Sequence, residues 1–125
     1  MTFRYLSILG LSFALTVGAQ SRNDLREKAA AARTAVEYKQ VASEYEKRAT
    51  DFEAKARRHE ANVIQMEKAA ERSPMKHKWP AMVQGPIDRE KSRAVQARRS
   101  ANESKVEAAR LQELAEKAPA LAVEE

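Results

Sequence analysis

Apolar residues recur at alternating steps of three and four along two long stretches of the chain. In the first stretch these positions are Tyr38, Ala42, Tyr45, Ala49, Phe52, Ala56, His59, Val63, Met66 and Ala70. In the second they are Ala94, Ala97, Ala101, Ser104, Ala108, Leu111, Ala115 and Ala118. Such a seven-residue repeat is typical of helices that pack along their length as in a coiled coil. We call these two sets the core positions of the first and the second helix.

Proline and glycine divide the two stretches. Neither residue occurs between Gln20 and Arg72, so the pattern predicts one long helix over residues 20–72. Pro74 ends it, and a second helix is expected over residues 87–118, because Pro86 suits a first helical turn and Pro119 follows the last one. Residues 73–86 then form a long connecting loop, and residues 119–125 form a flexible C-terminal tail.

Large residues at the core positions of the first helix complement small ones on the second. The predicted fold is therefore all-α, a long antiparallel two-helix hairpin that resembles a coiled coil with an Ala-rich seam. Residues 88–118 should lie against residues 42–72. The first helix then extends beyond the second and carries an apolar stripe of Leu25, Ala29, Ala32 and Val36 without a partner. This stripe predicts a homo-oligomer or a helical partner protein.

The first 19 residues have the layout of a cleaved signal peptide. Arg4 precedes an apolar run over residues 6–17, and the small residues Gly18 and Ala19 follow it. The run is shorter than the roughly 20 apolar residues that span a membrane. The expected mature protein begins at Gln20, has no membrane span, and is exported to the periplasm or the extracellular space.

Composition narrows the classes of function. The chain has no cysteine, so neither a disulfide nor a lipid-modified cysteine is expected. Its 23 Lys and Arg residues exceed its 18 Asp and Glu residues by five charges. A band that includes Arg98 and Arg99 could bind anionic envelope polymers. No aromatic side chain is interleaved with it for base stacking, so nucleic acid is not expected as a partner.

The sequence contains no recognisable catalytic motif. The chain has two histidines, and no nucleotide-binding glycine loop, Ser-His arrangement or pair of histidines four residues apart occurs. We therefore expect a protein that is not an enzyme and that needs no cofactor.

The connecting loop gathers rarer side chains, namely Met75, His77, Trp79 and Met82. Thioether and imidazole groups suit Cu(I), and this set resembles the ligand set of a periplasmic copper chaperone, whose fold is a small β-barrel. Met75, His77 and Met82 are the predicted metal ligands. In the alternative interpretation, Trp79, Pro80 and Met82 fold back as an apolar plug over the open end of the hairpin.

These patterns favour a non-enzymatic exported protein with a structural or protein-interaction role in the bacterial envelope or periplasm. Its predicted interaction residues are Trp79, Leu25, Val36, Arg98 and Arg99. Two alternatives stay open at this point: a periplasmic copper-binding protein that uses the loop, and a binder of anionic envelope polymers that uses the basic band.

Overall fold

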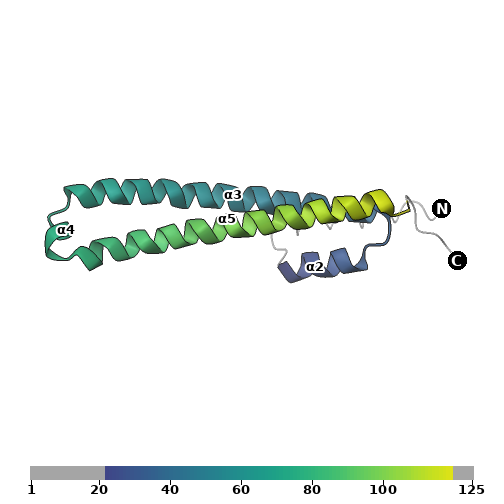
Figure 1. Ribbon diagram of the computed structural model, residues 1–125, viewed down its shortest axis with the longest axis horizontal. Coiled ribbons are helices and arrows are strands. Elements are labelled where there is room, and N and C mark those ends of the chain that lie inside the picture. The colour runs from purple at the N-terminus through teal and green to yellow at the C-terminus, as the bar shows by residue number, and fades with distance from the viewer. Residues whose placement is uncertain (1–21, 120–125) are drawn as a thin grey trace, which may run out of the picture.

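The computed structural model describes residues 22–119. The expected signal peptide and residues 120–125 of the expected tail lie outside the described residues. All regular elements within the described range are helices: α2 (Arg22–Ala31), α3 (Ala35–Arg72), α4 (Met75–Lys78) and α5 (Pro80–Lys117). Figure 1 shows that α3 and α5 run antiparallel as a long rod, with α4 at one end and α2 alongside the other. We call these ends the tip and the base.

The interface of α3 and α5 forms at the predicted core positions, which confirms the hairpin. The register differs slightly from the expected one, because α5 begins at Pro80 and Tyr45 packs with Ala108 and Leu111. The α5 positions from Ala94 to Ala115 in the predicted set are all buried, and Ala118 is partly buried. On α3, Ala42, Tyr45, Ala49, Ala56 and Val63 are buried, while the remaining predicted positions are partly buried. Because most of these side chains are alanines, the two helices can approach closely.

A ladder of polar pairs fixes the register of the hairpin. Every seventh residue of α3 from Glu46 to Glu67 is a glutamate, and each one meets a partner on α5. The pairs are Glu46 with Gln112 (2.5 Å), Glu53 with Lys105, Glu60 with Arg98 (2.6 Å) and Glu67 with Lys91 (3.2 Å). Each seven-residue step along α3 is matched by a seven-residue step back along α5. This spacing is the one expected for the positions that flank an antiparallel heptad core.

The first long helix is interrupted, which corrects the expectation of one helix over residues 20–72. The chain reverses direction between α2 and α3 (Figure 1). The Thr34 hydroxyl accepts a hydrogen bond from the backbone N–H of Glu37 (3.3 Å), and the Glu37 carboxylate accepts one from the N–H of Arg33 (3.1 Å). This arrangement is close to a capping box, so a helix can start here without Pro or Gly.

α2 folds back onto the base of the hairpin. Its buried residue, Leu25, belongs to a core cluster with Val41, Ala42, Tyr45, Ala108 and Leu111. Burial of a leucine side chain contributes about 1.5–3 kcal/mol, which favours the reversal over a continuous, partly bare helix. An ion pair between Lys28 and Glu44 (3.4 Å) also joins α2 to α3.

The docking of α2 covers part of the apolar stripe that was expected to have no partner within the chain. Leu25 and Ala32 are buried within the chain, whereas Val36 lies beyond the turn and is exposed. Leu25 is therefore a core residue and not an interaction residue, and the stripe no longer provides a reason for self-association. A homo-oligomer or a helical partner stays a prediction without that support.

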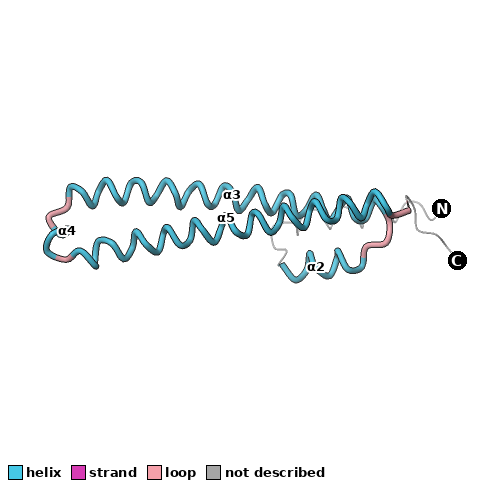
Figure 2. The backbone as a smooth tube through the Cα atoms, viewed as in Figure 1, coloured by secondary structure: helices cyan, strands magenta, loops and turns pink. Residues whose placement is uncertain are grey.

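The connection at the tip is shorter than expected. α3 ends at Arg72 as predicted, but α5 begins at Pro80, so Pro86 lies inside the helix and not at its start. Pro80 takes the favourable first helical position instead. Pro86 lacks an N–H group and is partly buried, so one backbone hydrogen bond is missing in the second turn of the helix. Figure 2 shows how little chain at the tip lies outside the helices.

Candidate interaction site at the hairpin tip

Backbone hydrogen bonds hold the tip in a compact turn. Ser73 caps the C-terminus of α3, and its hydroxyl accepts a hydrogen bond from the N–H of Met75 (3.2 Å). The N–H of Trp79 donates to the carbonyl of Met75 (2.7 Å), and the N–H of Met82 donates to the carbonyl of Trp79 (3.1 Å). The backbone of the single turn α4 is thereby joined to the first turn of α5.

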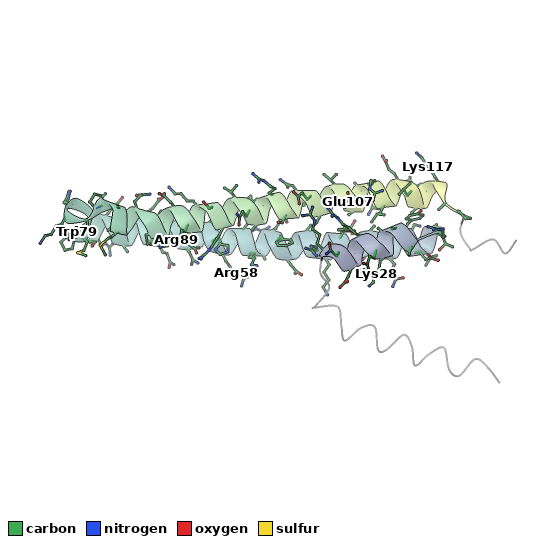
Figure 3. All side chains as sticks on the ribbon, turned by 90° about the horizontal axis from the view of Figure 1, so that it is seen from below. Lys28, Arg58, Trp79, Arg89, Glu107 and Lys117 are labelled. Atoms are coloured by element: carbon green, nitrogen blue, oxygen red, sulfur yellow. The ribbon has the colours of Figure 1, made fainter. Side chains whose placement is uncertain are left out.

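The side chains of this turn point outward. Trp79 is 53% exposed and Met82 is 64% exposed, and Met75 and His77 are exposed as well. The apolar plug is therefore wrong, because neither Trp79 nor Met82 is buried over the open end of the hairpin. Figure 3 places Trp79 at one end of the rod and Lys117 at the other.

The predicted metal ligands lie near one another along the chain but belong to different local elements. Met75 and His77 share the single turn α4, and Met82 lies in α5. Side chains two residues apart on a helix do not face each other, so Met75 and His77 do not converge in this conformation. No cluster of three or more His, Cys, Asp or Glu side chains suited to a metal occurs in the described part of the chain. That finding does not concern thioethers, and the copper site stays a prediction.

The charge of the tip is of one sign. Between Arg72 and Ile87 the sequence contains Lys76 and Lys78 and no acidic residue. Both lysines are exposed, and neither forms an ion pair with a residue of the described chain. Arg72 lies in the last turn of α3, where a cation complements the negative end of the helix dipole. Lys76 and Lys78 therefore contribute positive charge next to Trp79 in the sequence, without an ion pair in the described chain.

The predicted basic band is different, because one of its two main members is paired. The Arg98 guanidinium donates two hydrogen bonds to the Glu60 carboxylate (2.6 and 2.9 Å), while Arg99 is exposed. The hydrogen bond from Arg98 lowers the pKa of Glu60 below its ordinary value. A hydrogen bond from Lys105 lowers the pKa of Glu53 in the same way. Arg98 thus contributes to the ladder, and the polymer-binding role stays a prediction that rests on the remaining cations.

The interface contains a polar pair, His59 with Glu90, of which the predicted core positions included only His59. His59 occupies a core position, and its Nδ1 lies 2.7 Å from the Glu90 carboxylate. Glu90 continues the core spacing of α5 toward the tip, three residues after the buried Ile87 and four before Ala94. Hydrogen bonds from His59 and then Arg93 lower the pKa of Glu90. Extending the heptad spacing backward from Ala94 would have placed Glu90 at a core position of α5.

The ladder makes a prediction about pH that Arg98→Gln can test. A carboxyl group whose pKa is lowered in the folded state stabilises the fold above its unfolded pKa, and this contribution is lost as pH falls through the folded pKa. We expect Glu60 to titrate below the ordinary glutamate range in an NMR titration of the side-chain carboxyl groups. Arg98→Gln should raise the pKa of Glu60 and affect Glu53 much less, because Lys105 remains in place.

Arg99→Gln is the matched control for this titration. Arg99 is the neighbouring arginine and is exposed, so its loss should leave the pKa of Glu60 nearly unchanged. Equal shifts of Glu60 in both variants would mean that general charge, and not the Glu60–Arg98 pair, determines the pKa.

Comparisons with known proteins add no relative. No protein-family model matches this chain, and neither a curated protein nor a solved structure does. Among residues 22–119, no helix combines the length and the apolar character needed to cross a membrane. Function is therefore inferred from the geometry and chemistry of the described residues.

Proposed function

We propose that this protein is a non-enzymatic, exported structural or interaction protein of the bacterial envelope or periplasm, and that it makes its main contact through the tip of the hairpin. The observation that carries the proposal is the exposure of Trp79, Met75 and Met82 at the end of a long helical rod. Large aromatic side chains are enriched where proteins bind partners, and here the chain holds its single tryptophan out toward solvent.

The rod supports this role through its shape and register. α3 and α5 each contain 38 residues, which at 1.5 Å per residue corresponds to about 57 Å. The ladder from Glu46–Gln112 to Glu67–Lys91 ties the two helices along most of that length. A contact at the tip is thereby held far from the base, as a spacer or adaptor requires.

Export is the second part of the proposal and has its support in the sequence. The apolar run over residues 6–17 is followed by the small residues Gly18 and Ala19, three residues before α2 begins at Arg22. Cleavage after Ala19 would leave every described residue in the mature protein. Intact-mass measurement on exported material is expected to give a chain that begins at Gln20, and a chain that retains residues 1–19 would contradict this.

The tip contact can be tested by site-specific cross-linking in the envelope of the source cells. A photoreactive phenylalanine analogue is placed at position 79 or, as the control, at position 109. Ala109 is also exposed but lies near the base of α5. We expect specific cross-linked products, with protein or with lipid, from position 79 and none from position 109. Products of equal yield from both positions, or none from either, would overturn the proposed role of the tip.

A further inference from the structure

The exposed apolar surface of the tip is small. It consists mainly of three large side chains, Met75, Trp79 and Met82, at the end of the rod. A stable protein interface normally takes about 800 Å² and roughly 20–30 residues from each partner. One helical turn and the ends of two helices provide much less than that. A lipid surface has no such requirement, because a few side chains can insert between head groups.

The chemistry of these side chains also suits the boundary between water and lipid. The tryptophan ring is large and apolar but carries an N–H group, and it is enriched at the level of the head groups in membrane proteins. The flanking Lys76 and Lys78 form no ion pair within the described chain, and no acidic residue lies between Arg72 and Ile87. An anionic surface is the partner that complements this charge.

We propose that the tip binds the surface of membranes that contain anionic lipids, with Trp79 at the level of the head groups and Lys76 and Lys78 beside lipid phosphates. This proposal rests on the proposed function and names the partner of the tip. The rod would stand away from the membrane, because its apolar tip side chains lie at the end opposite Lys117 (Figure 3).

The test uses the chain from Gln20 to Glu125, which contains every described residue and lacks the apolar run that would itself bind lipid. Trp79 is the only tryptophan, so its fluorescence reports on the tip alone. Vesicles of phosphatidylglycerol and phosphatidylcholine in equal amounts are titrated into the protein, with pure phosphatidylcholine as the neutral comparison. We expect a saturable blue shift of Trp79 with the anionic vesicles, weakened by salt, and little shift with the neutral ones.

Charge-reversal variants distinguish the effect of the tip lysines on binding from the effect of the net charge of the protein. Each lysine near an anionic surface contributes roughly fivefold to affinity, so Lys76→Glu with Lys78→Glu should weaken binding by about 25-fold or more. Lys39→Glu with Lys117→Glu changes the net charge equally, but at the base. Those positions lie well beyond the screening length of about 10 Å in 0.1 M salt, so that variant should bind as the parent does.

A third variant tests the indole. Trp79→Ala should float with anionic vesicles much less than the parent in a density gradient, although its charge is the same.

An absent blue shift, equal binding to neutral vesicles, or equal weakening by the two double reversals would overturn the lipid proposal. Protein cross-links from position 79 without vesicle binding would overturn it and leave the interaction role intact, whereas the loss of both results would remove both proposals.

Discussion

Leu111→Ala is expected to lower the free energy of unfolding by about 2–5 kcal/mol, the usual range for truncating a fully buried leucine. Leu111 is 0% exposed and is the largest fully buried side chain among the described residues. It packs in the cluster where α2, α3 and α5 meet, together with Leu25 and Tyr45. An alanine would leave a cavity that these three helices share. Urea unfolding followed by circular dichroism measures the change.

Val106→Ala is the matched control on the same helix. Val106 is 66% exposed, so its truncation should change the free energy of unfolding by no more than about 0.5 kcal/mol. If the two substitutions had equal effects, Leu111 could not lie at the centre of the core.

Ala101→Leu is expected to destabilise the protein by about 1–3 kcal/mol, because extra methyl and methylene groups must fit into a close helix contact. Ala101 is 1% exposed and lies between Arg98 and Lys105 on α5. The side chains of Arg98 and Lys105 reach across to Glu60 and Glu53 on α3, so Ala101 lies inside the interface of the two helices. A leucine at this position would push the helices apart. Thermal unfolding followed by circular dichroism measures the shift of the midpoint.

Ala109→Leu introduces the same side chain at an exposed position of α5. This control should leave the midpoint nearly unchanged, since leucine and alanine are both good helix formers. An unchanged midpoint for Ala101→Leu as well would contradict the observed register of the hairpin.

The hairpin could be predicted because its signals are local and repeated. The core positions repeat at alternating steps of three and four residues along both helices. A rotation of either helix would expose a whole row of alanines. The break before Ala35 was missed because neither Pro nor Gly marks it. Thr34 and Glu37 are three residues apart and can cap a helix. This pair alone does not predict a break, because the reversal also depends on the burial of Leu25 against the hairpin.

The structure of the tip, in contrast to that of the hairpin, could not be predicted from local sequence signals. Local rules place a helix start at Pro86, yet the helix continues back to Pro80, and Ile87 is buried within it. The exposure of Trp79 could not be obtained from residue type, because tryptophan is usually at least partly buried and its burial depends on what packs beside it. The sequence gathers the unusual side chains in one place, but only the arrangement of α3, α4 and α5 shows that they face solvent.

The two ends of the rod are packed differently, and this bears on how the molecule opens. At the base, α2 adds a third helix, and the N–H of Ala35 donates to the carbonyl of Pro119 (2.8 Å), which ties the start of α3 to the chain beyond α5. At the tip, α3 and α5 are joined by the single turn α4, which has no buried residue, and further along the rod His59 and Glu90 replace apolar core residues. Segments with fewer buried apolar contacts unfold locally at lower free energy. Local unfolding should therefore begin at the tip, so the end that makes the proposed contact is also the end most able to adapt its shape.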